Sequence, residues 1–450
     1  MRQYKLLLAL AMLTVGLVLT FRSCQPRQSI ALMELEENLY QLNDTLKNSY
    51  SDHPQLVRME RYMRNWMARY RFRGASLSVM RGERLIYSKG LGWANEEDSI
   101  PAEAGHIFRI ASASKLITAI GILKLCDEGR ISTSDKVFGT KGILSDSIFL
   151  KYRDKRTANI TIHHLLTHTS GFSRRQGDLM FRSADLLRWT GKDTTMTVDE
   201  VIAYQLNQRL RCNPGGSAQY SNVGYLVLSR IIEEVSGMSY EKYIQEHVLH
   251  PAGVYDMHLA KNFYHERRAN EVKYYGHDPG ELIEAYDGSG EMRPREYGGN
   301  NTEGLQGAGA WVCSSAELLR LMAAVDGRNE VPDILSEKSI QELKKSRLKH
   351  ELPYGWAKLR SNAGVYSRTG TMSGTAAFAQ LNTNPDGLSF VLILNTSHYR
   401  GAGFTNRLGH TVLNAFSRVK EWPEGIDLFQ AVPSAEEPQT DSLSTPLVGA

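Results

Sequence analysis

The stretch Ser112-Ala113-Ser114-Lys115 runs directly into Leu116-Ile117-Thr118-Ala119-Ile120-Gly121-Ile122-Leu123 and decides the fold. The residues after Lys115 are apolar on almost every side of a helix, which predicts a buried central helix ending near Gly129. Ser112 then lies at the N-terminus of this helix, where the dipole and free N–H groups favour negative charge. Lys115 follows one turn later on the same face. The pattern is typical either of a serine nucleophile beside a lysine base, or of an N-capping serine with a solvated lysine.

Ser-x-x-Lys alone is a weak signal, because the chain holds four matches. Ser239 follows a glycine and is typical of a helix cap, and Ser346 lies in a charged run that indicates a solvated face. Ser417 lies in the last predicted helix, with nothing downstream to complete a site. Only Ser112 precedes an apolar helix, so this match is the candidate.

A second pattern, Tyr-x-Asn, occurs once, at Tyr220 and Asn222. It ends the glycine-containing stretch 214–222 and precedes a largely apolar helix predicted at 224–235. A tyrosine between glycines and a helix start can direct its phenol into a cleft. The structural alternative is a core tyrosine followed by a helix cap.

A third pattern, a basic residue followed by Thr-Gly, also occurs once, at Arg368-Thr369-Gly370-Thr371. It leads into a strand predicted at 374–381. A small residue lets the backbone approach a bound acyl group, and an N–H at a strand edge can stabilise an oxyanion. The structural alternative is an ordinary loop-to-strand turn with an exposed arginine.

Strand patterns lie at both ends of a long, mostly helical middle. Residues 75–80 and 84–87 predict two strands around a tight turn, and residues 374–381 and 388–395 predict two more around a turn-rich loop. A helix at 404–419 closes the domain. Strands that enclose helices predict an α+β fold with one antiparallel sheet.

Composition excludes several classes of protein. The 450 residues are 42% hydrophobic and 23% charged, which excludes a disordered chain and a coiled-coil rod. A mean hydropathy of -0.36 excludes a polytopic membrane protein. The net charge of +4 is small and dispersed along the chain, so we expect no nucleic-acid partner.

No metal or cofactor motif is evident. His164 and His168 are four residues apart but lack the glutamate of His-Glu-x-x-His, so we interpret the stretch around them as structural. A metal hydrolase built on these histidines is the alternative. Cys126 reads as a core residue, and a disulfide among the other cysteines stays open. Those cysteines are Cys24, Cys212 and Cys313.

Residues 1–24 predict a targeting signal. Arg2 and Lys5 precede an uncharged apolar run at 6–21, which is typical of an export signal. Three outcomes stay open: lipidation at Cys24, an uncleaved anchor, and a cleaved signal. All three place the body outside the cytoplasm, in a bacterial periplasm or cell envelope. The first two, which we favour, also give an N-terminal membrane association.

The remaining boundaries follow from composition. Residues 25–71 predict a linker and N-terminal helices, one of them near 55–70. Residues 72–419 form the predicted main domain. Residues 420–450 are acidic and rich in proline, which predicts a disordered tail.

The three ordered patterns together resemble the serine β-lactamase and penicillin-binding protein superfamily. The tyrosine of the second pattern is similar to its class C branch, which includes class C β-lactamases, D-alanyl-D-alanine carboxypeptidases, related esterases and D-aminopeptidases. Residues 160–172, 251–254 and 307–311 are similar to flanking stretches of that superfamily. The resemblance implies an antiparallel sheet flanked by helices, a mostly helical subdomain, and an active site between them.

The resemblance also implies roles for individual residues. Ser112 becomes the acylated nucleophile, and Lys115 and Tyr220 share general-base and general-acid work. The backbone N–H groups of Ser112 and Thr371 form the oxyanion hole. Asn222 orients either the substrate amide or Lys115. No metal and no cofactor are implied.

The chain departs from the superfamily pattern at Arg368, which stands where Lys or His is usual. An arginine stays charged and cannot shuttle protons. It is suited to binding a substrate carboxylate or to lowering the pKa of Tyr220 electrostatically. Residues between Phe172 and Val201 read as an inserted loop that can shape the cleft.

The expected function is acyl transfer from an amide, ester or β-lactam carbonyl, with a small molecule or peptide as substrate. Cell-wall peptide or D-amino-acid amide hydrolysis is favoured, with possible binding to peptidoglycan. Esterase and β-lactamase activity are alternatives at the same site. A non-catalytic envelope sensor or binding module is a further alternative, and the oligomeric state is open.

Overall fold

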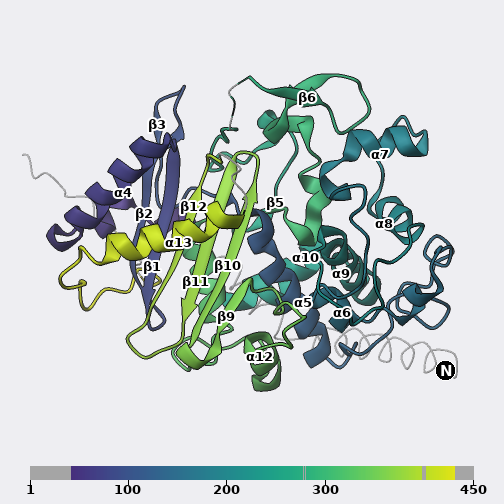
Figure 1. The fold of residues 1–450 in the computed structure, drawn as a ribbon. Helices are drawn as coiled ribbons and strands as arrows, with labels where there is room; N and C mark the ends of the chain where they lie inside the picture. The colour runs from purple at the N-terminus through teal and green to yellow at the C-terminus, as the bar shows by residue number, and fades with distance from the viewer. Residues whose placement is uncertain (1–41, 277, 279, 398–401, 431–450) are drawn as a thin grey trace, which may run out of the picture. The chain divides into compact units, whose positions relative to one another are not determined.

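A computed structural model describes residues 42–276, 278, 280–397 and 402–430. Its main feature is a seven-stranded antiparallel sheet of order β3-β2-β1-β12-β11-β10-β9 (Figure 1), which confirms the predicted α+β class. The strands are β1 (Gly74–Arg81), β2 (Arg84–Asn95), β3 (Ile100–Pro101), β9 (Lys358–Arg360), β10 (Val365–Met372), β11 (Thr375–Asn382) and β12 (Leu388–Leu394). The smaller sheets comprise β4 (Phe108–Arg109), β5 (His258–Leu259) and β8 (Trp311–Cys313), and the pair β6 (Leu282–Glu284) and β7 (Met292–Pro294).

Helices lie on both faces of the sheet and form a separate helical region beside it (Figure 1). They are α3 (Leu42–Thr45), α4 (Val57–Tyr70), α5 (Ser114–Asp127), α6 (Ile162–Leu166), α7 (Ser183–Thr190), α8 (Val198–Leu206), α9 (Asn222–Ser236), α10 (Tyr240–Ile244), α11 (Ser315–Ala323), α12 (Glu337–Lys344) and α13 (Ala402–Phe416). The 3-10 turns η3 (Ala111–Ala113), η5 (Leu179–Phe181) and η10 (Glu303–Ala308) bear on the site.

The sequence pattern predicted β1, β2, β11 and β12, but it did not predict β10 or the edge strand β9. The turn between β1 and β2 is tight and holds Gly82 at φ 62°, as expected. The stretch at 366–371, expected as a loop leading into a strand, is itself part of β10. Its polar residues lie at the end of the strand that borders the site, where hydrophobic periodicity carries little information.

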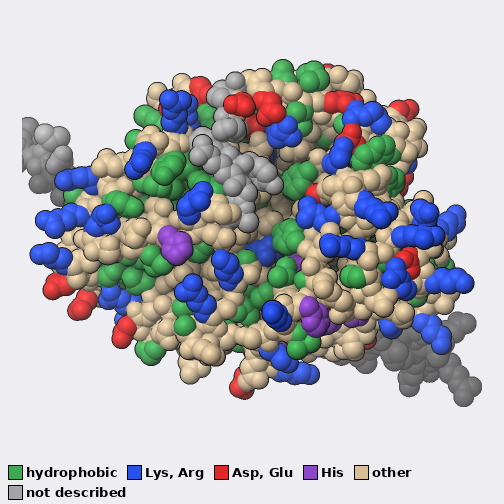
Figure 2. Space-filling model, in the orientation of Figure 1, with side chains coloured by type: hydrophobic (Ala, Val, Ile, Leu, Met, Phe, Trp, Pro, Cys, Tyr) green, Lys and Arg blue, Asp and Glu red, His purple; other side chains and the backbone are tan. Residues whose placement is uncertain are grey.

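The alternation of β12 separates two hydrophobic cores. Phe390 and Leu392 pack with α4 and α13 on the outer face of the sheet, whereas Val391 and Ile393 pack with α5 and α11 on the inner face. This follows from the two-residue period of a strand. The outer layer of α4 and α13 carries many Lys and Arg side chains on its surface (Figure 2).

The central helix α5 lies in the inner core. Eleven of its fourteen residues are buried, which confirms the helix predicted after Ser112. It ends at Asp127, and Gly129 follows at φ 70°, as predicted for a residue just beyond a helix C-terminus.

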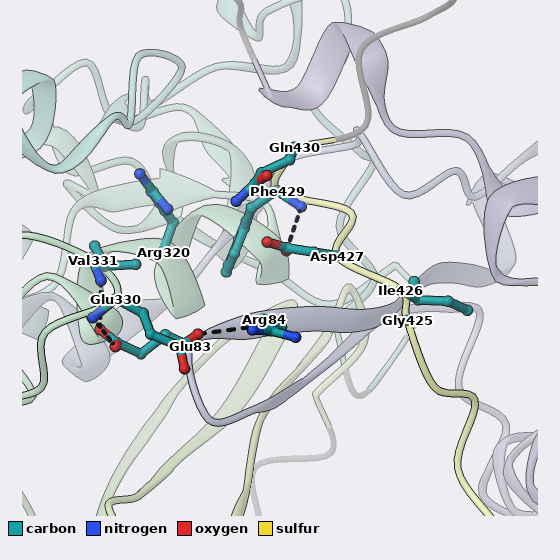
Figure 3. Close-up of a pocket in the computed structure, with 10 residues that line it drawn as sticks. All are labelled: Glu83, Arg84, Arg320, Glu330, Val331, Gly425, Ile426, Asp427, Phe429 and Gln430. Carbon is teal, nitrogen blue, oxygen red and sulfur yellow. Dashed lines mark hydrogen bonds and ion pairs between the residues drawn. The ribbon is translucent and has the colours of Figure 1, made fainter.

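The start of the segment predicted to be disordered is ordered. Leu428 is buried and its N–H donates to the Leu85 carbonyl, while Asp427 accepts the Leu85 N–H. Phe429 stacks against the Arg320 guanidinium and helps to line a cavity of about 380 Å³ (Figure 3). The structure differs here from the predicted disorder, because Ile426, Leu428 and Phe429 pack against the inner core and the acidic composition gives no sign of these contacts. Residues 431–450 lie outside the described part of the chain.

The predicted targeting segment, residues 1–24, also lies outside the described residues, as does Cys24. Among the residues that the structure describes, no helix is both long and apolar enough to cross a membrane.

Candidate active site

Ser112 lies in the 3-10 turn η3, immediately before the first turn of α5. The preceding residue, Ala111, has φ 47°, a conformation that is uncommon for a residue with a side chain. This left-handed residue is the first of η3 and lies two positions after the end of β4 at Arg109. The predicted location of Ser112 at the N-terminus of a buried helix is confirmed.

Lys115 is fully buried, which excludes the alternative of a solvated lysine. Its Nζ lies 3.3 Å from Ser112 Oγ, 2.6 Å from Asn222 Oδ1 and 2.5 Å from the Ala308 carbonyl oxygen. Burial lowers its pKa, and the Arg368 guanidinium acts in the same direction, while Tyr220 opposes them. A lysine held in this way is suited to accept a proton.

Tyr220 contacts the same serine from the other side. Its hydroxyl donates to Ser112 Oγ at 2.8 Å, and the Arg368 guanidinium donates to the Tyr220 oxygen at 3.2 Å. Lys115 Nζ lies 4.9 Å from the centre of the Tyr220 ring. The core-tyrosine alternative is therefore excluded, because the phenol lies among the other predicted site residues.

The pKa of Tyr220 is lowered to about 8. Burial alone raises the pKa of a phenol, but the Lys115 and Arg368 cations outweigh it here, and hydrogen bonds to Lys115 and Ser112 act in the same direction. Arg368 thus acts in the direction expected for one of its two predicted roles, the lowering of the pKa of Tyr220. A phenol with this pKa is suited to general acid–base work near neutral pH.

Asn222 is the first residue of α9, and Ser221 caps that helix by accepting the Gly224 N–H. Asn222 Oδ1 accepts from Lys115 at 2.6 Å, so the amide orients Lys115, as one of the two predicted roles requires. The start of α9 thereby places both Tyr220 and Asn222 beside α5.

β10 brings the third pattern to the same place. Arg368 and Gly370 lie on its buried face, toward α5, and Arg368 Nε donates to the Ser112 carbonyl oxygen at 2.8 Å. Arg368 is only 3% exposed, so the alternative of a solvated arginine is excluded.

The outer edge of β10 is partly open. β9 pairs only with residues 365–367, and the Ser367 carbonyl accepts the Ala357 N–H on that side. The N–H and C=O groups of residues two apart point to the same side of a strand. The N–H and C=O groups of Thr369 and Thr371 therefore point to the same edge of β10 as those of Ser367. Beyond Ser367, no described strand covers it. The Thr371 N–H therefore faces the edge at which the predicted oxyanion donor is needed.

Gly370 lets the strand approach the start of η3. A Cβ at this position would overlap the Ile110 carbonyl oxygen and lie 3.0 Å from the Ala113 nitrogen. The glycine was expected to admit a bound acyl group, and the close contact is instead with the chain itself.

We expect Gly370→Ala to lower the free energy of unfolding by about 3 kcal/mol, because backbone atoms must separate to admit the methyl group. Urea unfolding measures this change. Gly403→Ala is the control, since nothing lies within 4 Å of a Cβ there and the change favours α13 by about 0.5 kcal/mol. An unchanged unfolding midpoint for Gly370→Ala would contradict the packing described.

Asp178 was missed by the sequence reasoning. It lies at the start of η5 in the predicted inserted loop, and its Oδ2 accepts from Asn222 Nδ2 at 2.7 Å. Arg174 lies 3.6 Å from the same carboxylate and donates to the Tyr220 carbonyl at 3.4 Å. No motif marks this contact, because the two residues are 44 positions apart and neither spacing nor residue type is distinctive.

We expect Asp178→Ala to lower kcat/KM about tenfold, because Asn222 loses the acceptor that fixes its amide and with it the position of Lys115. Steady-state kinetics on any substrate that the protein accepts measures the loss. Asp185→Ala is the matched control, because Asp185 lies in the same loop and pairs with Arg182 and Arg188 on the surface. Equal effects of the two changes would mean that Asp178 acts only through the loop.

The histidines have structural partners. His168 Nδ1 accepts the Ser221 N–H at 3.1 Å, and burial holds its pKa well below the usual range. His164 Nδ1 accepts the Thr161 N–H at 3.1 Å. Within the described ranges, no three His, Cys, Asp or Glu side chains gather as a metal site would require. Both histidines accept backbone N–H groups, which is a structural role of the kind expected for them.

The described cysteines are not paired. Cys126, Cys212 and Cys313 are free thiols, which closes the possibility of a disulfide between Cys212 and Cys313. Cys126 packs against the inner core, as predicted.

The fold and site define a class, that of serine hydrolases with a β-lactamase fold. The family model described as Beta-lactamase matches residues 59–412. The chain therefore belongs to the β-lactamase family, and the resemblance drawn from three short patterns is confirmed.

Individual relatives agree with this assignment. Penicillin-binding protein 4* of Bacillus subtilis is 27% identical over 266 residues, which cover 57% of this chain and 53% of that protein. The chain thus matches about half the length of that relative. The octameric penicillin-binding protein homologue of Pyrococcus abyssi superposes with a TM-score of 0.61 at 25% identity, over 82% of this chain and 79% of the other.

A further solved structure shares the fold. D-amino acid amidase of Ochrobactrum anthropi SV3 superposes with a TM-score of 0.63 at 20% identity, covering 82% of this chain and all of that one (100%).

Proposed function

We propose that the protein hydrolyses an acyl compound in two steps through an acyl-enzyme on Ser112. The observation that carries this proposal is the position of Ser112 Oγ, 2.8 Å from the Tyr220 hydroxyl and 3.3 Å from Lys115 Nζ. A serine hydroxyl needs such a base to become a nucleophile.

The first step is attack of Ser112 Oγ on the substrate carbonyl. Its proton passes to the Lys115–Tyr220 pair, and the carbonyl oxygen becomes an oxyanion that the N–H groups of Ser112 and Thr371 stabilise. The oxyanion collapses, and the pair returns the proton to the leaving amine, alcohol or ring nitrogen. Water then attacks the acyl-enzyme and restores Ser112. Arg368 keeps its charge throughout and carries no proton.

The favoured substrate is a cell-wall peptide or a D-amino-acid amide. The Bacillus and Pyrococcus relatives are named for penicillin, which contains a reactive cyclic amide, and the D-amino acid amidase shares the fold. An ester or a β-lactam is attacked by the same residues in the same order, and these remain the alternative substrates.

The test is intact mass spectrometry of the protein with benzylpenicillin, a fluorophosphonate probe, and a panel of D-amino-acid amides. We expect the fluorophosphonate adduct on Ser112 and release of amine from at least one amide. A persistent penicillin adduct favours a peptidase, and loss of the drug favours a β-lactamase. An unlabelled serine with every probe would overturn the proposal in favour of a non-catalytic binding module.

The pH dependence follows from the pKa of Tyr220. If the phenolate is the productive form, kcat/KM rises with pH through about 8 and then levels off. Arg368→Gln removes a cation that lowers this pKa, so the rising limb shifts to higher pH and the rate at pH 7 falls. A pH profile of both proteins on one substrate measures the shift. If kcat/KM rises over the same pH range in the variant and the wild type, the group that titrates is not Tyr220.

The proposed setting is the bacterial cell envelope, on the basis of residues 1–24. Expression of the whole chain in a bacterial host, followed by intact mass, separates three products. A lipid adduct on Cys24, a full-length chain and a truncated chain correspond to the three outcomes left open by the sequence.

A further inference from the structure

The outer helical layer carries a local excess of positive charge. Residues 57–73 and 402–420, which contain α4 and α13, hold nine Arg or Lys residues and one acid, Glu60. Two further acids, Glu421 and Glu424, follow directly, and with them these segments carry a net charge of +6. The whole chain carries only +4, so the rest of the protein is slightly acidic.

The basic residues are dispersed along the sequence, but the fold brings those of α4 and α13 together. α4 and α13 are more than 300 residues apart, yet they pack beside each other on the outer face of the sheet (Figure 1). Blue side chains are spread over this region in Figure 2. We call the exposed side of residues 57–73 and 402–420 the basic face.

Four of the six arginines in residues 57–73 have no ion-pair partner among the described residues, whereas Arg64 pairs with Glu60 at 4.0 Å and Arg73 pairs with Glu96 at 2.7 Å. Arg58, Arg61, Arg69 and Arg71 are exposed and form no ion pair with any described residue. The one acid of α4, Glu60, is turned toward the sheet, where it accepts from the buried Lys89 at 2.9 Å.

Apolar side chains are exposed among these cations. Val57 is 49% exposed, Tyr70 39% and Leu413 43%. The main apolar face of α4 packs on the sheet, so only these few side chains are available to enter the interface of a bilayer beside the cations.

We propose that the basic face binds the anionic headgroups of a lipid bilayer. Charge complementarity is the first argument, because clustered arginines near a surface of anionic lipid each add to the binding free energy. The second argument is the chain that precedes the structure. The apolar run at 6–21, proposed above as an export signal or anchor, is 35 residues before α4, so its support for membrane binding rests on that proposal.

The proposal does not depend on the catalytic assignment. Ser112 and its partners lie on the inner side of the sheet, with α5, whereas the basic face covers the outer side. A change in the basic face should leave the labelling of Ser112 unchanged.

The test measures partition of the full chain between buffer and vesicles. One set of vesicles is phosphatidylcholine, and the other is an equimolar mixture of phosphatidylcholine and phosphatidylglycerol. The test variant combines Arg58→Gln, Arg61→Gln and Arg69→Gln. The control combines Lys141→Gln, Lys151→Gln and Arg153→Gln, which removes the same charge from exposed positions in the helical region. Residues 1–41 are common to all three proteins, so their contribution cancels in the comparison.

We expect the wild type to prefer anionic vesicles, and the test variant to lose about a hundredfold of that preference. The control variant should retain it, and added salt should reduce it in the wild type. Thermal unfolding and fluorophosphonate labelling of each protein show that fold and site are intact. Equal preference in the wild type and the test variant would overturn the proposal. So would binding to duplex DNA with no preference for anionic vesicles.

Discussion

Replacing Ser112 by alanine is expected to lower kcat about 10⁶-fold and to abolish labelling by a fluorophosphonate. The expected loss is large because removal of a nucleophile leaves only substrate binding and oxyanion stabilisation. The Ser112 hydroxyl is shared between Tyr220 and Lys115 in the structure, so no neighbouring serine can replace it. Turnover on the best substrate from the panel, with intact mass in parallel, measures both effects.

The chain supplies its own control for this change. Ser239 begins a second Ser-x-x-Lys match, but its side chain accepts the Lys242 N–H as the cap of α10. Ser239→Ala should cost about 1 kcal/mol of stability and leave turnover unchanged. If Ser112→Ala keeps the turnover of the wild type, the nucleophile is misassigned.

Replacing Lys115 by methionine is expected to lower kcat/KM by about 10³- to 10⁴-fold. Methionine keeps the length of the side chain but removes the group that shares the Ser112 proton with Tyr220. It also removes the cation that does most to lower the pKa of Tyr220, so the remaining base is weaker as well. Steady-state kinetics and the rate of acylation by a fluorophosphonate measure the loss.

Stability must be followed in the same variant. Asn222 Oδ1 and the Ala308 carbonyl both lose their donor, and each buried acceptor left alone costs about 1–3 kcal/mol. Thermal unfolding separates this cost from the catalytic one. Lys242→Met is the matched control, because Lys242 is exposed in the second Ser-x-x-Lys match and pairs only with Glu246. A Lys115→Met protein that is folded and retains a tenth of the activity would remove Lys115 from the mechanism.

The site could be predicted from the sequence wherever a residue type is unusual for its place. A lysine at the start of an apolar helix, a single Tyr-x-Asn and a single basic-Thr-Gly are each conspicuous. Their assembly around Ser112 Oγ required only that the helix and strand be placed correctly. The antiparallel sheet was predictable for a related reason, since β1, β11 and β12 are short, largely apolar stretches and tight or turn-rich connections join β1 to β2 and β11 to β12.

Other parts depend on contacts that sequence patterns do not contain. Asp178 and Asn222 meet because a loop without periodicity folds back over α9. The basic face exists because two helices far apart in the sequence pack side by side. The net charge of the whole chain does not reveal this, because acids elsewhere cancel the positive charge of these helices. Residues 421–430 looked disordered by composition, although Leu428 and Phe429 are enough to hold them to the body.

The contact between Gly370 and the Ile110 carbonyl has a consequence for how this chain can diverge. Ser112 and Tyr220 can each be replaced without opening the junction between β10 and η3, so mutations that follow a loss of activity can remove them, whereas a change of Lys115 also leaves two buried acceptors without a donor. Gly370 is needed for the packing of β10 against η3. In a related protein that lacked this glycine, stability and cellular abundance would fall whether or not the site was active. A glycine at this position in a related chain therefore indicates a folded protein, whereas the serine, lysine and tyrosine indicate a working one.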